Sequence, residues 1–500
     1  MFESAELGHK LDKKEYDKIV PELRADLLDV QYDVLEAKRF PVIILISGIE
    51  GAGKGETVNL LNEWMDPRHI ENHAFPAPTD EERARPPMWR FWRALPPRGK
   101  LGVFFGNWYT DAVVPRVAGV IKQAELDERL AEIKRFEKML TDEGALLFKF
   151  WFHLSKKNQK RRLETLSKDP KTRWRVTDAD WRRYKQYDRY AEISEHALRI
   201  TSQGHAPWLV VDGYDERYRS VTVGNILLDA MRKRVAWKGD TTRRINAAPI
   251  VRPIDKVNVL NSLNLTQALT KKKYQSELEA WQGRLNVLAR DPRFNRHSLL
   301  VLFEGNDAAG KGGAIRRITQ ALDARQYTIV PIAAPTEEER AQPYLWRFWR
   351  HVPGASRFAI FDRSWYGRVL VERVEGYCAE PDWMRAYGEI NDFEDQLSVA
   401  GTIVVKFWLT ISQEEQLRRF KEREQTRFKR FKITEEDWRN REKWPAYEQA
   451  ICDMVDRTST EIAPWTLVEA NDKNFARIKV LKTICERLEA AYKQDKNSKK

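Results

Sequence analysis

The sequence predicts an α/β fold made of two tandem copies of a three-layer α/β/α sandwich, each with a parallel sheet. Three observations predict it. The chain has 500 residues, which is too long for one ordinary core. It repeats itself at an offset of 257 residues, the distance from Lys54 to Lys311. Within each copy, continuous apolar runs alternate with helical patterns, which is typical of layered domains with parallel strands.

The repeat sets the domain organisation. "GIEGAGKG" (48–55) matches "GNDAAGKG" (305–312), and "LLFKFWFHLS" (146–155) matches "IVVKFWLTIS" (403–412). So long a period indicates a duplicated domain rather than a solenoid. We predict a first domain over 1–235, a basic, Pro-containing linker over 236–260, and a second domain over 261–500.

The elements of the second copy are expected in a fixed order. The apolar run "SLLVLFE" predicts a buried strand, and a Gly-rich turn and the helix "KGGAIRRITQALD" follow. Next come a short strand ("YTIVPIAA"), a Trp- and Arg-rich helix, and the strand "RFAIFD". A long helix leads to "TIVVKFWLTI", and a charged helical stretch precedes the last strand, "PWTLVEA". Ligands of such sheets bind beyond the carboxyl ends of the strands.

Composition narrows the class of protein. The formal net charge is +13, which favours a polyanionic partner such as nucleic acid, a nucleotide, polyphosphate or an acidic membrane face, and equally favours a solubility surface. The three cysteines form no C-x-x-C pair, which argues against a disulfide scaffold or a cysteine zinc site and fits a reducing compartment. No signal pattern or membrane-length apolar run is present, so we expect a cytoplasmic protein without a membrane partner.

A phosphate loop is the strongest motif. Residues 305–311 fit G-x-x-x-x-G-K between a buried strand and a helix, where backbone N–H groups and a helix N-terminus attract anions. Lys311 would contact the outer phosphates. The other residues expected to line the bound phosphates are Gly305, Asn306, Ala308, Ala309, Gly310, Gly312 and Gly313.

The loop lacks the usual metal-binding hydroxyl. Gly312 stands where the pattern normally has Ser or Thr, so another oxygen must hold Mg²⁺. Asp307 in the loop and Asp362 at the end of a strand are the candidate ligands. The alternative for Asp362 is a capping role together with Ser364.

Together, "EGNDAAGKGG", "LWRFW", "FDRSWYGRVLVERVEG", "KFWL" and "APWTLVEANDK" make the chain resemble polyphosphate kinase family 2, and its tandem layout resembles the two-domain members. The resemblance covers nearly the whole chain. It implies a P-loop-kinase-like fold and Mg²⁺- or Mn²⁺-dependent transfer of a phosphoryl group from inorganic polyphosphate to AMP, giving ADP.

The second copy carries a full set of candidate residues. Asp307 would also orient the AMP phosphate, Arg363 and Arg368 would neutralise the migrating group, and by family similarity Glu372, expected on the same helix, would organise the site. Arg373 is either a ligand or a solvated helix face. The basic stretch 418–438 is either a lid or an ordinary charged helix. The remaining candidates for phosphate or nucleotide contacts are Arg347, Arg423, Arg427, Lys429, Arg430 and Lys432. Arg347 lies between Trp346 and Trp349, which either stack on adenine or belong to the core.

The first copy has lost most of this set. At the equivalent positions, Asp362 is replaced by Phe105, Arg363 by Gly106, Arg368 by Asp111, Glu372 by Pro115 and Asp307 by Glu50. The first copy keeps the loop lysine, as Lys54, and the Trp-Tyr pair, as Trp108 and Tyr109. We therefore expect a non-catalytic first domain, which either binds phosphate chains or only buries an interface.

Two other functions stay open. One is an ATP-dependent nucleoside-monophosphate kinase, against which Gly312 argues. The other is a basic nucleotide- or nucleic-acid-binding protein, for which no recognition motif is present, so no specific nucleic acid is expected. The fused domains suggest a homodimer by analogy with four-domain assemblies.

Overall fold

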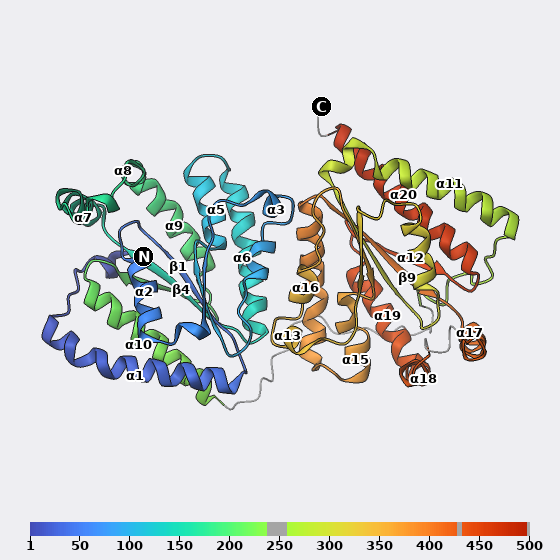
Figure 1. The fold of residues 1–500 in the computed structure, drawn as a ribbon, viewed down its shortest axis with the longest axis horizontal. Helices are drawn as coiled ribbons and strands as arrows, with labels where there is room; N and C mark the ends of the chain where they lie inside the picture. Colours follow the sequence, from blue (N-terminus) through green and yellow to red (C-terminus); the bar gives the residue numbers. More distant parts are fainter. Residues whose placement is uncertain (238–257, 428–432, 498–500) are drawn as a thin grey trace. The chain divides into compact units, whose positions relative to one another are not determined.

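The computed structural model describes residues 1–237, 258–427 and 433–497, which form two compact units, each built around one sheet (Figure 1). Both sheets have five strands, all paired in parallel. The first has the order β2-β3-β1-β4-β5 and the second the order β7-β8-β6-β9-β10 from one edge to the other. Because these orders correspond strand for strand, the predicted duplication and α/β class are confirmed.

The first copy of the repeat follows the expected alternation. Its strands are β1 (Val42–Gly48), β2 (Ile70–Ala74), β3 (Leu101–Phe105), β4 (Leu146–His153) and β5 (Trp208–Asp212). Its helices are α1 (Lys13–Ala37), α2 (Lys54–Trp64), α3 (Asp80–Arg83), α4 (Trp89–Arg93), α5 (Trp108–Val117), α6 (Gln123–Asp142), α7 (Lys156–Lys168), α8 (Asp178–Lys185), α9 (Tyr187–Thr201) and α10 (Glu216–Ala236).

The second copy of the repeat has the same pattern. Its strands are β6 (Ser298–Gly305), β7 (Tyr327–Pro331), β8 (Phe358–Asp362), β9 (Thr402–Thr410) and β10 (Trp465–Glu469). Its helices are α11 (Lys271–Ala289), α12 (Lys311–Thr319), α13 (Glu337–Arg340), α14 (Trp346–Trp349), α15 (Val371–Glu375), α16 (Glu380–Val399), α17 (Gln413–Gln425), α18 (Glu435–Glu442), α19 (Trp444–Thr458) and α20 (Lys473–Asn497). Short 3₁₀ turns include η5 (Trp365–Arg368).

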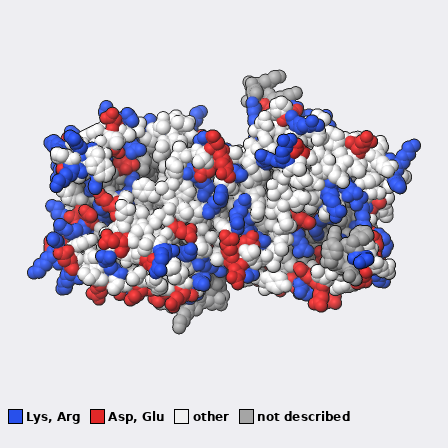
Figure 2. Space-filling view, in the orientation of Figure 1, with Lys and Arg blue, Asp and Glu red and all other residues white. Residues whose placement is uncertain are grey.

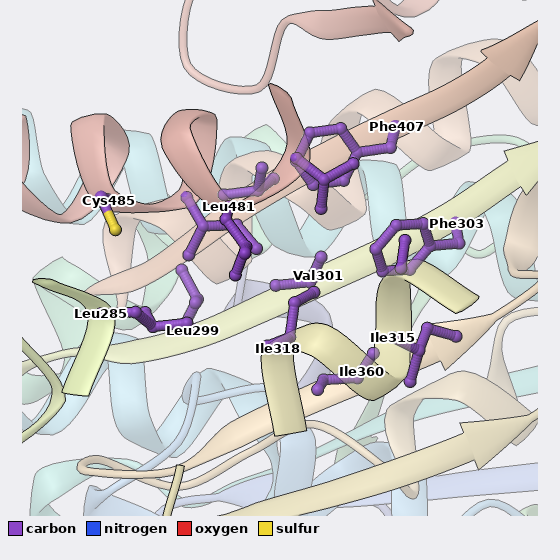
Figure 3. Close-up of a cluster of buried hydrophobic side chains, with 14 of the residues drawn as sticks. Leu285, Leu299, Val301, Phe303, Ile315, Ile318, Ile360, Phe407, Leu481 and Cys485 are labelled. Carbon is purple, nitrogen blue, oxygen red and sulfur yellow. The ribbon is translucent and has the colours of Figure 1, made fainter. Parts of the chain in front are cut away.

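Helices cover both faces of each sheet. In the second unit α11, α12 and α20 lie on one side of the strands and α16 and α19 on the other (Figure 1). Alternate residues of β6, namely Leu299, Val301 and Phe303, point into the first layer and meet Ile318 of α12 and Leu481 of α20 (Figure 3). This apolar contact fixes β6 against α12, and the phosphate loop connects these two elements.

One local prediction is wrong. Glu372 does not lie on the same helix as the preceding Trp-Tyr pair, because η5 ends at Arg368 and α15 begins at Val371. Leu370, between them, has φ −110° and ψ −97°, which is not helical. The segment is two short turns in the second copy.

The first copy shows why the helix breaks. There, the continuous helix α5 is capped by Asn107, whose N–H donates to the Thr110 hydroxyl at 3.3 Å. The residue equivalent to Thr110 in the second copy is Gly367, which has no hydroxyl and greater conformational freedom. The capping box is therefore absent and the chain turns more tightly.

Candidate active site

The phosphate loop leaves β6 at Gly305, where the backbone approaches β9 closely. A Cβ atom at Gly305 would lie 2.5 Å from the Leu409 carbonyl oxygen, so only glycine fits. The Asn306 side-chain oxygen accepts a hydrogen bond from the Ile411 N–H at 3.2 Å. Both contacts hold the loop at the carboxyl edge of the sheet, where the sequence placed it.

Lys311 begins α12, and its Nζ donates to the Gly305 carbonyl at 2.7 Å. Gly310, just before it, has φ +112°, a conformation that favours glycine, and Ala308 has φ +65°. The lysine thus lies across the loop, as a residue that contacts phosphates must. The other predicted loop residues are placed as follows: Ala309 is buried, Gly312 borders open space and Gly313 lies beside Arg477.

A buried arginine that sequence reasoning missed supports the loop from below. Arg419 of α17 is 2% exposed, and its guanidinium donates to the carbonyl oxygens of Ala308, Ala309, Ala470 and Asn471 at 2.7–3.0 Å. Because a guanidinium presents its donors in a fixed fork, it clamps the loop to the end of β10. It lay within a run of Lys and Arg that gave no reason to single it out.

The two candidate metal ligands lie at adjacent strand ends. Strand pairing places Asp362 of β8 opposite Phe303 of β6, two residues before the loop begins. Asp307 accepts a hydrogen bond from Asn440 Nδ2 at 2.9 Å, and its other oxygen lies 3.7 Å from Arg363 Nη2. No hydrogen-bond donor among residues 1–237, 258–427 and 433–497 contacts the Asp362 carboxylate. Ser364, not Asp362, caps the next turn by accepting from the Tyr366 N–H.

Arg363 is held in a strained backbone conformation. Its φ is +66°, in the left-handed region that side chains other than glycine rarely adopt. The first copy has Gly106 at the same place with φ +69°. Burial lowers the pKa of Arg363, but the carboxylates of Asp307, Glu304, Glu436 and Asp362 outweigh it and raise that pKa above the ordinary value. Such strain at a charged residue in a ligand-binding edge is typical of functional sites.

Glu304 is a second residue that sequence reasoning missed. Its side chain is buried beside the loop and accepts a hydrogen bond from Ser364 Oγ at 2.8 Å. Desolvation raises its pKa to about 7. In the first copy, Ser47 stands at the place of Glu304 and Asn107 at the place of Ser364, and Asn107 Nδ2 donates to Ser47 Oγ at 3.0 Å. Both members of the hydrogen-bonded pair therefore differ between the copies. Glu304 was missed because it ends a run of residues that was interpreted only as a buried apolar strand.

The two predicted arginines that follow Arg363, namely Arg368 and Arg373, each form an ion pair. Arg368 Nε lies 2.8 Å from Glu372 Oε2. Arg373 lies 2.7 Å from Asp453 Oδ2 and donates to the Tyr387 hydroxyl at 3.0 Å, so it joins α15 to α19 and α16 rather than facing solvent.

Residues just after the predicted lid segment 418–438, which the sequence did not single out, reach the site. Asn440 of α18 contacts Asp307, as described above, and Lys443 lies 2.8 Å from Glu375, which is 5% exposed on its side chain. Arg439 also contacts Glu375, at 3.2 Å. The region 418–438 is therefore not one helix: α17 ends at Gln425 and α18 begins at Glu435.

The remaining predicted phosphate ligands differ in position. Arg423 is half-buried on α17, whereas Arg427 is exposed. Lys429, Arg430 and Lys432 lie outside the described residues. Arg347 is buried and donates to the Ala333 carbonyl at 3.0 Å, and its neighbours Trp346 and Trp349 are buried as well, in keeping with the core alternative.

The Trp-Tyr pair that both copies keep belongs to a buried polar network. In the second copy Glu394 accepts from Trp365 Nε1 at 3.0 Å, from the Tyr366 hydroxyl at 2.7 Å and from Lys406 Nζ at 2.7 Å. In the first copy, Glu137 accepts from Trp108, Tyr109 and Lys149 at 3.0, 2.8 and 2.7 Å. The pair is therefore structural, which explains its survival where the neighbouring charges are lost.

The loop of the first copy keeps its lysine in a changed setting. Lys54 Nζ donates to the Gly48 carbonyl at 2.9 Å and lies 3.6 Å from Glu50. Phe105, at the place of Asp362, is 37% exposed. Arg219 is buried beneath this loop, its guanidinium 2.1 Å from where a Cβ of Gly53 would lie.

No group of three or more His, Cys, Asp or Glu side chains in metal-binding arrangement occurs in the described parts of the chain. The donor set of the second copy nevertheless suits a hard divalent cation, because Asp307 and Asp362 offer carboxylate oxygens beside a phosphate loop and leave positions for substrate oxygens and water. None of the helices within these parts is long and apolar enough to cross a membrane.

The chain has close relatives among known proteins. The model of the family described as polyphosphate kinase 2 matches residues 10–238 and 268–496. Polyphosphate:AMP phosphotransferase of Pseudomonas aeruginosa is 64% identical over 496 residues, 99% of this chain and 100% of that protein. The protein of that name from Pseudomonas syringae pv. tomato is 58% identical, over 99% of this chain and 100% of its own length. The one from Acinetobacter johnsonii is 40% identical, over 94% of this chain and 96% of its own length.

A crystal structure from Pseudomonas aeruginosa, of a protein described as a candidate polyphosphate kinase 2, matches with a TM-score of 0.89 and 61% identity, covering 99% of each chain. Relatives and structure agree over both copies. The chain therefore belongs to the polyphosphate kinase 2 family.

Proposed function

We propose that this chain is a polyphosphate:AMP phosphotransferase, which transfers the terminal phosphoryl group of inorganic polyphosphate to AMP and so forms ADP. The observation that carries the proposal is the charged cluster of the second copy, where Lys311, Asp307, Arg363 and Asp362 meet at the ends of β6 and β8. The full-length relatives named polyphosphate:AMP phosphotransferase supply the donor and the acceptor.

Each charged group has a role in this reaction. Lys311 and the loop N–H groups bind the phosphates, while Asp307 and Asp362 would hold Mg²⁺ or Mn²⁺, which would supply positive charge to neutralise the phosphates. Arg363 lies beside Asp307 and stabilises charge on the migrating group. Because the AMP phosphate is already ionised near neutral pH, its attack requires no strong general base. Arg368, paired with Glu372, would assist from the neighbouring turn.

The lid completes the site. Asn440 binds Asp307 directly, and Lys443 and Arg439 converge on Glu375. Closure of this segment would exclude water, so that the phosphoryl group passes to AMP instead of being hydrolysed. Arg423, Arg427 and the basic residues near them are the proposed contacts with the polyphosphate chain, and Arg373 keeps α15 in place.

The first copy is proposed to be non-catalytic, because Phe105 and Gly106 remove a carboxylate and a guanidinium that the reaction needs. A cytoplasmic location and a homodimer remain predictions from the sequence.

A specific observation weakens the nucleic-acid alternative. On the face of the molecule shown in Figure 2, basic and acidic side chains are interspersed over both units, and the basic excess is not gathered into one stripe. Nucleic-acid binders usually concentrate it. The nucleoside-monophosphate kinase alternative differs only in its donor, so a direct comparison of donors separates it.

The test is an ADP-formation assay with AMP, Mg²⁺ and long-chain polyphosphate, run in parallel with ATP as donor. Asp362→Asn should abolish polyphosphate-dependent ADP formation. Asp323→Asn, the same change at a surface aspartate paired with Arg325, should leave it intact. Activity with ATP alone would move the protein to the ordinary nucleotide kinases, and an active Asp362→Asn enzyme would refute the assignment of the catalytic copy.

A further inference from the structure

The first copy contains a cavity where the second has its charged site. It has a volume of about 430 Å³ and opens beside the phosphate loop at Lys54. Most of its walls are apolar or aromatic, among them Phe105, Val114, Trp151, Tyr190 and Leu198. Its size falls in the range of small-molecule sites, which are mostly apolar with a few placed polar groups.

Shortened side chains open this cavity. Ser194 and Ala197 of α9 stand where the second copy has Ile451 and Met454, both of which are buried there. Ala118 likewise stands at the place of Glu375, the acid that binds Lys443 and Arg439 in the second copy. Compared with the second copy, the first therefore lacks an acidic group just after α5 and bulky side chains on α9.

Two buried polar atoms in the cavity wall have no hydrogen-bond partner of ordinary length and angle within the described residues. These are Ser194 Oγ, near the Tyr190 hydroxyl, and Gln159 Oε1. In the second copy the equivalent of Gln159, Gln416, accepts from Arg441 at 3.2 Å, and the first copy has Tyr184 at the place of that arginine. The wall of the first copy has therefore lost the charged partner that this glutamine has in the second copy.

The charged groups lie at one end only. Lys54 Nζ is 3.6 Å from Glu50, and Arg183 is 3.7 Å from the same carboxylate, so two cations face one acid. This end attracts an anion. The apolar interior excludes a polyphosphate chain, because each further phosphate would lose its hydration without gaining a partner.

We propose that the first copy binds a small anion with a flat apolar ring system, whose single phosphate or carboxylate lies at Lys54 and Arg183 and whose ring enters the cavity beside the stacked rings of Trp151 and Tyr190. Aryl phosphates and aromatic acids share this chemistry, and nucleoside monophosphates share the flat ring and the single anionic group. The site would be a second, non-catalytic one, and its existence does not depend on the reaction proposed for the second copy.

The experiment is a fluorescence titration of the full chain with 8-anilinonaphthalene-1-sulfonate, a ring system with one anionic group. We expect saturable binding to the unaltered protein. Ala197→Met and Ser194→Ile restore the bulk of the second copy and should each weaken binding at least about tenfold. Ala25→Met, the same change at an exposed position of α1, is the matched control and should bind like the unaltered chain.

Lys54→Met tests the anionic end without filling the cavity and should weaken binding about fivefold, so the proposal is decided even if a filled variant fails to fold. Competitors identify the ligand class in a Lys311→Met background, in which the catalytic loop is disabled. Displacement by AMP, or by benzoate and phenyl phosphate, supports the proposal and separates nucleotides from aromatic acids.

Three outcomes would overturn it. One is the absence of saturable binding, a second is equal binding by Ala197→Met and Ala25→Met, and the third is displacement by inorganic phosphate as effectively as by the ring-bearing anions. Because binding is read without phosphoryl transfer, these outcomes are independent of the ADP-formation assay.

Discussion

Replacing Lys406 by methionine tests the buried polar network most directly. The Lys406 ammonium is fully buried and donates to Glu394 at 2.7 Å, to the Tyr366 hydroxyl at 2.8 Å and to the Thr458 carbonyl at 2.6 Å. Methionine keeps most of the side-chain volume but leaves the Glu394 carboxylate as a buried charge with only neutral donors.

The expected cost follows from that burial. Breaking a buried pair by removing one partner typically lowers the free energy of unfolding by about 3–5 kcal/mol, a large part of the ~5–15 kcal/mol that holds a domain together. The double variant Lys406→Met with Glu394→Gln removes both charges, so it should be more stable than Lys406→Met alone. The measurement is urea unfolding followed by tryptophan fluorescence.

The first copy offers a matched control. Lys149→Met breaks the equivalent pair with Glu137, which is also buried, and should destabilise its own unit by a similar amount. Activity per folded molecule should fall only with Lys406→Met, because Tyr366 lies three residues after Arg363 whereas the first copy is proposed to be non-catalytic. A loss below about 1 kcal/mol, the size typical of surface ion pairs, would refute the reasoning, as would a double variant no more stable than the single one.

Three further predictions concern the second copy. Arg363→Gly should slow phosphoryl transfer by at least about a hundredfold. It should not lower the free energy of unfolding, because glycine adopts a positive φ without strain. A less stable variant would contradict the inference that the Arg363 backbone is strained. Glu304→Gln should remove part of the pH dependence of stability. The pKa of Glu304 is about 7 in the folded chain and 4.5 in the unfolded chain, so the free energy of unfolding falls as the pH rises through that interval. In urea unfolding, the variant should therefore show a smaller difference in this free energy between pH 5 and pH 7.5 than the unaltered chain. Arg419→Leu removes four hydrogen bonds to loop and strand-end carbonyls and should cost about 2–4 kcal/mol while raising the KM for polyphosphate, with Arg419→Lys intermediate; unchanged kinetics would show that the loop does not need this clamp.

The sequence predicts the parts of this molecule that local pattern controls. Buried apolar runs and a Gly-rich turn are local signals, so the two parallel sheets and the position of Lys311 could be predicted. Arg419 and Asn440 could not, because their partners in the phosphate loop lie more than a hundred residues away and nothing in a run of charged residues marks the one that folds inward.

Glu304 and the break before Glu372 were missed for other reasons. An acid at the end of an apolar strand looks exposed until its partner, here Ser364, is placed beside it. The helix breaks because Gly367 lacks the capping hydroxyl that Thr110 supplies in the first copy. Helical periodicity in the sequence does not depend on such a capping group, so it could not predict the break.

The shared turn at Gly106 and Arg363 has a consequence for redesign. Since the backbone of the first copy already has φ +69° where the second has +66°, the path of the main chain at the end of β3 is ready for an Asp-Arg pair at positions 105 and 106. At this turn the two copies differ in side-chain chemistry and share a backbone path, so an Asp-Arg pair could be introduced there by substitution alone, without rebuilding the turn.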